Sequence, residues 1–223
     1  MFDKFTELMR EELSEFSIEL SEHQLHQFYQ YFELLVEWNK VMNLTAITEL
    51  EDVVTKHFVD SLSLVKAVSD LSDEKILDMG TGAGFPGIPL KIAFPELKIT
   101  LLDSLNKRIN FLNEVIGQLQ LGEIQAVHGR AEDYGRDKLY REQYDYCVSR
   151  AVANLSTLSE YCMPYVKIGG AFIPYKSGKI EEVVTFVLPK TDVERSFVIV
   201  RKTEGTSKKY PRKAGLPSKE PLK

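Results

Sequence analysis

Glycine and aspartate residues form the pattern in this chain that is most informative about chemistry. Asp78 ends an apolar run, and Gly80, Gly82 and Gly84 follow at every second position. Glycine suits a turn in which the backbone takes unusual dihedral angles and a ligand approaches it closely. Asp103 lies about 25 residues further on, where a carboxylate can accept hydrogen bonds from ribose hydroxyls. Together these residues predict a site for an adenosine-containing cofactor.

The identity of that cofactor depends on the residues within the glycine pattern. The spacing Gly82-x-Gly84-x-x-Gly87 also fits the dinucleotide-binding fingerprint. Pro86, however, lies where a diphosphate would be bound, and it has no amide hydrogen to donate to one. Asp78 ends its run close to where a positively charged ligand group would lie. We therefore expect S-adenosylmethionine, and the alternatives are an NAD-dependent oxidoreductase and a non-catalytic nucleotide-sensing module.

The glycine pattern needs a strand before it and a helix after it, and the surrounding sequence predicts both. Apolar runs predict strands at residues 76–79, 98–103, 124–128, 144–149 and 171–176. Helical patterns lie between them at residues 88–93, 106–119 and 154–162. Such alternation is typical of a parallel sheet whose strands are joined by right-handed helical crossovers.

The first 70 or so residues are predicted to be helical, because apolar residues recur at spacings of three and four. A second helix begins at Ser21, whose hydroxyl can cap it while Gln24 reaches back. We expect a turn at residues 39–43, a short helix through Phe58, and another helix that opens at Ser61.

The end of the predicted sheet presents a geometric difficulty. Residues 180–188 and 197–201, with a turn at 189–192, predict an antiparallel hairpin. A parallel return from the fifth strand to a sixth needs a crossover of about a dozen residues or more, and residues 177–179 cannot supply it. Either the sixth strand pairs differently, or a helical segment is absent near Gly178.

Positive charge is concentrated at the C-terminal end, although the net charge is −5. Residues 201–223 contain eight Lys or Arg residues against two Glu. Such a run is often a solvated tail, but here Tyr210 lies among the charges, which suits phosphate contacts combined with base stacking. The RNA-binding candidates are Lys208, Lys209, Arg212 and Lys213.

Other features limit the class of protein. No apolar run approaches the roughly 20 residues of a membrane span, so we expect a cytoplasmic protein with no membrane partner. Cys147 and Cys162 both lie in apolar surroundings and are predicted to be core residues. Two cysteines indicate neither a disulfide framework nor a cysteine-rich metal site, and we expect no metal.

Several stretches of the chain resemble one family. They are residues 38–45, 57–62, 78–87, 129–132, 149–153 and 210–215. In combination they resemble the bacterial 16S ribosomal RNA guanine-N7 methyltransferase G family, also called glucose-inhibited division protein B. The likeness spans nearly the whole chain. It departs from the family near Gly178, where the family has a longer segment that contains a helix.

The resemblance implies a fold, an activity and partners. The expected fold is a doubly wound, Rossmann-like class I methyltransferase, with a mostly parallel seven-stranded sheet, an antiparallel terminal hairpin and an N-terminal helical layer. Residues 1–72 would form the helical extension packed on the main domain, 73–203 the S-adenosylmethionine-binding domain and 204–223 a basic RNA-binding segment. The implied activity is methyl transfer to N7 of one guanine in the decoding-region hairpin of 16S ribosomal RNA. We expect a monomer that acts on this RNA or on a small-subunit assembly intermediate.

The resemblance also implies cofactor-binding residues, to which the glycine pattern adds three. The full set of expected cofactor residues is Asp78, Gly80, Gly82, Gly84, Phe85, Asp103, Ala131, Glu132 and Arg150. Arg150 is in addition the candidate for positioning the cofactor or the guanine, with a salt bridge to a neighbouring helix as the alternative. His57 and Asp60 are either a polar pair facing the cleft or part of a helix start, and Asn43 is either functional or a turn former.

The proposed base explains what the sequence lacks. Guanine N7 carries a lone pair and no proton, so its attack on a methyl group needs no general base, only positioning and electrostatics. After the fourth predicted strand the chain has Ser149-Arg-Ala-Val152, with neither the Pro-Cys nucleophile of a pyrimidine C5 enzyme nor the Asn/Asp-Pro-Pro-aromatic motif expected for an exocyclic amine. We therefore expect direct transfer without a catalytic base.

Overall fold

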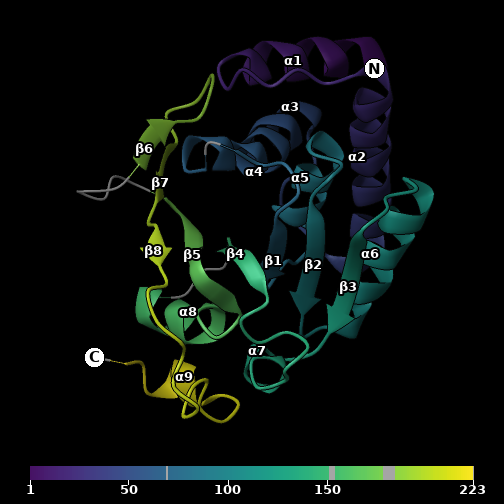
Figure 1. The fold of residues 1–223 in the computed structure, drawn as a ribbon. Helices are drawn as coiled ribbons and strands as arrows, with labels where there is room; N and C mark the ends of the chain where they lie inside the picture. The colour runs from purple at the N-terminus through teal and green to yellow at the C-terminus, as the bar shows by residue number, and fades with distance from the viewer. Residues whose placement is uncertain (69, 151–153, 178–183, 223) are drawn as a thin grey trace.

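The computed structural model describes residues 1–68, 70–150, 154–177 and 184–222. These residues form a central sheet with helices on both faces, and the two termini lie at opposite ends of the molecule (Figure 1). Within the described residues the strand order is β3-β2-β1-β4-β5-β7-β6, and an eighth strand, β8, pairs with β5. The expected mostly parallel α/β sheet is confirmed, and the part of the chain that the structure describes contributes eight strands to it, where seven were predicted.

The first five strands are parallel to one another. They are β1 (Lys75–Met79), β2 (Lys98–Asp103), β3 (Ile124–His128), β4 (Tyr144–Ser149) and β5 (Val166–Ser177). The first four match the prediction closely, but β5 begins five residues before the predicted start. The register shifts between Tyr144, which pairs with Val166, and Tyr146, which pairs with Ala171. Gly169 lies in this irregular part and has φ +88°, so a glycine-containing bulge extends the strand.

Four helices connect or follow these strands and cover the two faces of the sheet. They are α5 (Gly87–Ala93), α6 (Asn106–Gln118), α7 (Ala131–Tyr134) and α8 (Leu155–Cys162). Side chains alternate along β1, so Ile76 packs in the core that includes α5 and α6, whereas Leu77 packs in the core beneath α8. Cys147 and Cys162 are both buried in the α8 core, as expected.

The N-terminal layer begins with α1 (Phe2–Ser14) and α2 (Glu22–Met42). The predicted capping box is present, since Ser21 accepts from the Gln24 amide and Gln24 accepts from the Ser21 amide. The turn predicted at residues 39–43 is wrong, because α2 continues through Met42 and ends at Asn43, which has φ +49°. Asparagine tolerates this left-handed conformation, so the helix ends later than the composition indicated.

The second part of this layer is one continuous helical stretch. It consists of α3 (Leu50–Val53), the π-helical segment η1 (Val54–Val59), α4 (Asp60–Leu62) and the 3-10 helix η2 (Ser63–Lys66). The helix start predicted at Ser61 is wrong. The Ser61 hydroxyl donates to the backbone oxygen of His57 one turn earlier, which lets a buried serine lie inside a helix. No helix within the described ranges is both long enough and apolar enough to cross a membrane.

The sheet ends in the expected antiparallel hairpin, but with different bounds. Its strands are β6 (Val184–Val187) and β7 (Glu194–Phe197), joined through the predicted turn at 189–192. The second hairpin strand was predicted at 197–201, too late, because the turn closes with the Leu188 amide bonded to the Val193 oxygen. Residues Val200–Arg201 instead form β8, which pairs with β5.

The position of β7 shows how the strand after β5 pairs, although residues 177–179 are too few for a parallel crossover. It lies between β5 and β6 and is antiparallel to both, so among the described residues β6 pairs with β7 alone. The sixth strand therefore does pair differently from a simple parallel neighbour of β5. Residues 180–183 of the predicted strand, and Gly178 itself, lie outside the described residues.

Candidate functional site

The glycine turn after β1 is fastened to the end of β2. The Gly80 amide donates to the Leu102 oxygen at 2.9 Å, and the Gly82 amide donates to the Asp103 carboxylate at 3.0 Å. Gly80, Gly82 and Gly84 all have positive φ, at 68°, 64° and 99°. The sequence thus places glycine where other residues would be strained.

A cavity of about 500 Å³ opens beside this turn, at the carboxyl ends of β1, β2 and β3, and we call it the β1–β3 cavity. It is lined by Met79, Gly80, Leu102, Asp103, Ser104, Arg108, Gly129, Arg130, Ala131, Glu132, Ser149, Leu158, Tyr161 and Gly215. Four of the predicted cofactor residues are among these: Gly80, Asp103, Ala131 and Glu132. The other five, Asp78, Gly82, Gly84, Phe85 and Arg150, do not line it. An open parallel sheet binds its ligands at this edge.

Some residues that line the cavity were not predicted. Leu158 and Tyr161 lie three positions apart on α8, so helical spacing was a signal that could have found them as one face. Arg108, in the first turn of α6, donates to Asp103 at 3.1 Å. Gly215 comes from the C-terminal segment, and its contact with the cavity depends on tertiary folding alone.

Asp103 is the most constrained carboxylate in this cavity. It is 3% exposed, and it accepts from the Gly82 amide, from the Leu105 amide at 2.9 Å and from Arg108. These donors fix the carboxylate at the mouth of the glycine turn. The contact of Asp103 with ribose hydroxyls stays a prediction.

Replacing Asp103 with alanine should weaken S-adenosylmethionine binding by about 1.5–3 kcal/mol, because charge-assisted hydrogen bonds would be lost. Isothermal titration measures this directly. The matched control is Asp133→Ala, which removes an exposed acid from the nearby helix α7 and should leave affinity unchanged. Equal affinity of the Asp103→Ala variant and the unmodified protein would exclude Asp103 from the site.

The C-terminal segment reaches the cavity through Gly215. The Gly215 amide donates to the Glu132 carboxylate at 2.7 Å, which brings residues far apart in the chain together. Arg136 and Arg141 hold the same segment by donating to the backbone oxygens of Pro211 and Tyr210. Figure 1 shows α9 (Leu216–Lys219) beside α8 and near α7. The described part of the segment is therefore docked and does not form a solvated tail.

The four RNA-binding candidates differ in their environments. Arg212 donates to both oxygens of Glu160, at 2.8 and 2.7 Å, and the Glu160 side chain is fully buried. Burial alone would raise the pKa of Glu160, but the Arg212 bonds outweigh it and lower that pKa. Lys208, Lys209 and Lys213 are exposed. Arg212 thus anchors the segment to α8, and the three lysines are the candidates that face solvent.

Asp78 lies beneath the glycine turn instead of in the cavity. One carboxylate oxygen accepts from the Thr81 hydroxyl at 2.7 Å and from the Gly87 amide at 2.8 Å, and the other has no partner in the described structure. Complete burial raises the pKa of Asp78 to about 6, although the Thr81 and Gly87 bonds and the charge of Arg150 act against the rise. Asp78 therefore stabilises the glycine turn through its bonds to Thr81 and Gly87.

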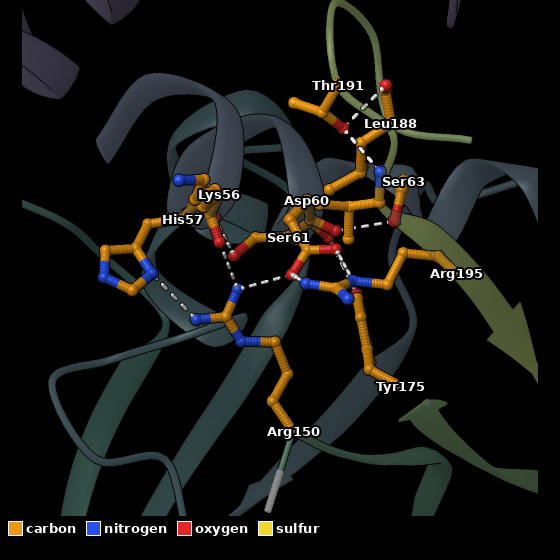
Figure 2. A network of polar contacts seen from close by, with 11 residues as sticks. Lys56, His57, Asp60, Ser61, Ser63, Arg150, Tyr175, Leu188, Thr191 and Arg195 are labelled. Carbon is orange, nitrogen blue, oxygen red and sulfur yellow. Dashed lines mark hydrogen bonds and ion pairs between the residues drawn. The ribbon is translucent and has the colours of Figure 1, made fainter. Parts of the chain in front are cut away.

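Phe85 also points away from the β1–β3 cavity, into the N-terminal layer. Its ring stacks on His57, with centroids 4.4 Å apart and planes 14° apart, and the Arg150 guanidinium lies 5.1 Å from its centroid. Arg150 donates to Asp60 at 2.9 Å, and Arg195 donates to the other Asp60 oxygen at 2.6 Å. Figure 2 shows Asp60 between the two guanidinium groups. The salt bridge to a neighbouring helix, which was the alternative role for Arg150, is therefore present, and it belongs to one network with His57 and Asp60.

The hydrogen bonds of His57 identify its tautomer. Arg150 can only donate, so Nδ1 of His57, 3.2 Å away, must accept, and the ring proton lies on Nε2. Nε2 then donates to the Thr45 hydroxyl at 2.9 Å. Burial, and then the Arg150 charge, lower the pKa of His57 to about 3. His57 is thus a neutral residue that orients Arg150.

Asp78 and His57 should give opposite slopes of stability against pH. The folded-state pKa of Asp78 is raised, so stability falls as pH rises from about 4 to about 6, where only the unfolded chain loses this proton. The folded-state pKa of His57 is lowered, so stability rises with pH between about 3 and 6.5. Relative to the unmodified protein, Asp78→Asn should add a positive slope and His57→Gln a negative one. Each change approaches about 1.4 kcal/mol per pH unit.

Urea unfolding at a series of pH values between 4 and 6 measures these slopes. If both variants keep the slope of the unmodified protein, the pKa of Asp78 is not raised and the pKa of His57 is not lowered in the folded protein.

The fold resembles that of solved structures. A structure from Methanococcus maripaludis, described as an S-adenosylmethionine-dependent methyltransferase, superposes with a TM-score of 0.52. The match covers 78% of this chain and 93% of that one, at 14% sequence identity. This likeness shows that the two chains share a Rossmann-like α/β fold.

Sequence comparisons define the family. The family model described as rRNA small subunit methyltransferase G (GidB) matches residues 24–199. Curated relatives named ribosomal RNA small subunit methyltransferase G include one from Lachnoclostridium phytofermentans, 54% identical over 94% of both chains, and one from Alkaliphilus oremlandii, 47% identical over 97% of this chain and 98% of its own. This chain belongs to the rRNA small subunit methyltransferase G family.

A third relative bears on the length of the chain. The protein of the same name from Thermoanaerobacter sp. is 48% identical, with 100% of both chains covered. The alignment runs over 240 positions, more than the 223 residues of this chain. That relative therefore carries residues that this chain lacks.

Proposed function

We propose that this protein transfers a methyl group from S-adenosylmethionine to N7 of a specific guanine in the decoding-region hairpin of 16S ribosomal RNA. The observation that carries the proposal is membership of the methyltransferase G family along nearly the whole chain. We further propose that it acts in the cytoplasm as a monomer, on the RNA itself or on a small-subunit assembly intermediate.

The residues of the β1–β3 cavity fit the cofactor. A volume of about 500 Å³ at the carboxyl edge of the sheet is of the size that small-molecule sites have. Asp103 and Glu132 supply buried carboxylates for hydroxyl and amine groups, and Ala131 and Leu158 supply apolar surface for a purine. The Gly80 backbone leaves room for close approach, because no β-carbon projects there.

When bound, S-adenosylmethionine supplies a methyl group activated by the positive charge on its sulfur. Guanine N7 would accept this methyl group with its lone pair. No proton moves, so the chain has to orient the two reactants and exclude water. Asp103 and Glu132 would hold the nucleoside part of the cofactor, and Arg150, at the end of β4, would orient the guanine.

Tritium-labelled methyl transfer tests the proposal. The purified protein should label 16S ribosomal RNA or small subunits, and borohydride–aniline treatment should then cleave the RNA at the N7-methylated guanine. Labelling without cleavage would overturn the assignment to N7. Saturable binding of NADH without binding of S-adenosylmethionine would overturn the methyltransferase assignment and favour the oxidoreductase alternative.

The exposed lysines of the C-terminal segment provide a test of RNA contact. Combining Lys208→Gln, Lys209→Gln and Lys213→Gln should reduce RNA affinity and lower the slope of log affinity against log salt by about 2 to 3, since each lost phosphate contact contributes 0.7 to 0.9. Arg212 is left intact because it anchors the segment. Filter binding at several salt concentrations measures the slope. The control is Lys98→Gln, at the amino end of β2, the end away from Asp103. An unchanged slope would show that these lysines do not contact phosphates.

A further inference from the structure

Helix α7 is too short to fix its own position beside the β1–β3 cavity. It spans four residues, Ala131–Tyr134, and two of them, Ala131 and Glu132, line the cavity. An isolated helix needs about 12 to 15 residues before it is even marginally stable in water. The strand before α7 is β3, which lies at the edge of the sheet among the described strands. The position of α7 therefore depends on other parts of the chain that pack against it.

The C-terminal segment, by which we mean residues 204–222, supplies much of this packing. Arg136, two residues after the end of α7, donates twice to the Pro211 oxygen, at 3.2 and 2.7 Å. Arg141 donates to the Gly135 oxygen at 2.8 Å and to the Tyr210 oxygen at 2.9 Å. One guanidinium thus ties the end of α7 to the segment, and a second guanidinium next to it holds the following residue.

The same segment holds the side chain of Glu132. The Gly215 amide donates to Oε1 of Glu132 at 2.7 Å, and Glu132 is only 7% exposed. Among the residues that the structure describes, Oε2 of Glu132 accepts no hydrogen bond from the protein. A bond from an amide to a carboxylate is charge-assisted and directional, so it fixes one oxygen and leaves the other for a ligand in the cavity.

The segment is also anchored to the opposite side of the cavity, on α8. Arg212 pairs with the fully buried Glu160 carboxylate, and the Thr157 hydroxyl donates to the Pro217 oxygen at 3.2 Å. Figure 1 shows α9 beside α8 and near α7. Both helices contribute residues to the cavity lining. The segment therefore bridges the two helices that flank one end of the β1–β3 cavity.

We infer that the C-terminal segment is part of the cofactor site, because it positions Glu132 to accept a hydrogen bond from the adenine amino group of S-adenosylmethionine. This inference rests on the proposed placement of the cofactor in the β1–β3 cavity. Arg136 and Arg141 are then positioning residues, since neither lines the cavity and both act through the segment. Holding Glu132 in place before the ligand arrives removes an ordering cost from binding.

Variants of the two arginines test this role. Arg136→Gln combined with Arg141→Gln should weaken S-adenosylmethionine binding by about tenfold or more, the effect of losing one charge-assisted hydrogen bond. The kcat at saturating cofactor and RNA should change less than twofold, and lysine at both positions should restore part of the affinity. The control is Lys138→Gln, which removes an exposed cation between the two arginines and should change neither value. Isothermal titration gives the affinities.

A double-mutant cycle separates positioning from a general structural defect. In a Glu132→Ala background the two arginine changes should cost less than a further twofold in cofactor affinity, because the residue through which they act is already gone. If the losses instead multiply, the arginines do not act through Glu132 and the inference is wrong.

Hydrogen exchange tests the inference in the unmodified protein. A ligand that binds only the docked form reduces local opening by the factor 1 + [L]/Kd, so S-adenosylmethionine at about 100 times its Kd should slow exchange of the α9 amides by up to about 100-fold. The amides of α1, which does not line the cavity, should not change. Unchanged exchange in α9 would overturn the inference. If the protein still binds S-adenosylmethionine and methylates RNA, the proposed function stands and only the role of the segment fails.

Discussion

Replacing Asp60 with alanine should lower the free energy of unfolding by about 3–5 kcal/mol, the cost of removing one partner from a buried ion pair. The Asp60 side chain is 3% exposed and accepts from Arg150 and Arg195, whose side chains are 18% and 17% exposed. Without the carboxylate, two mostly buried guanidinium groups would lose the negative charge that both of them contact. Their repulsion adds to the lost hydrogen bonds.

The matched control is Asp52→Ala, on the same helical stretch. Asp52 is half exposed and pairs with Lys56 one turn away, so its removal should cost less than about 1 kcal/mol. Urea unfolding followed by circular dichroism gives both values. Similar losses for the two variants would show that the Asp60 network contributes no more than a surface ion pair.

The Asp60 network also shows what the sequence could not provide. Asp60 is 90 residues from Arg150 and 135 from Arg195 in the chain, so no local spacing connects them. His57 and Asp60 were recognisable as a polar pair, but Arg195, a partner of Asp60, lies on β7, a strand whose bounds were predicted too late. Contacts between distant elements depend on where each strand begins and ends. Apolar patterns in the sequence place these bounds only to within a few residues.

The glycine turn was predictable because its cause is local. Positive φ at Gly80, Gly82 and Gly84 needs glycine at fixed spacing, and the strand before it is a simple apolar run. The direction in which the Asp78 side chain points was predicted less accurately. Alternation along β1 places Asp78 on the face opposite Leu77, but only the structure shows that its carboxylate bonds to Thr81 and Gly87 under the turn.

Charge composition was informative about the C-terminal segment, but not about its conformation. Eight basic residues in residues 201–223 indicated either a tail or an RNA contact. The structure uses Arg212 to neutralise Glu160 and Lys202 to neutralise Glu142, so part of that charge anchors the segment. A count of charges does not distinguish these roles, because the acidic partners lie on other elements.

Replacing Gly84 with alanine should lower the free energy of unfolding by about 2–5 kcal/mol, from overpacking and from left-handed strain. Gly84 has φ +99°, and an added β-carbon would lie 2.5 Å from Cδ1 of Ile88 and 2.8 Å from the Tyr31 hydroxyl. Ile88 can turn its terminal methyl aside. Tyr31 cannot move as easily, because it is buried and its hydroxyl donates to the Ala83 oxygen.

Gly82→Ala separates strain from packing. Gly82 has φ +64° but no atom within 4 Å of an added β-carbon, so only the left-handed strain of about 1–2 kcal/mol applies. The difference between the two variants in thermal and urea unfolding therefore measures the packing of Gly84 against Tyr31 and Ile88. Equal losses would mean that Tyr31 and Ile88 yield without cost, and the glycine at position 84 would then be required by backbone conformation alone, as at position 82.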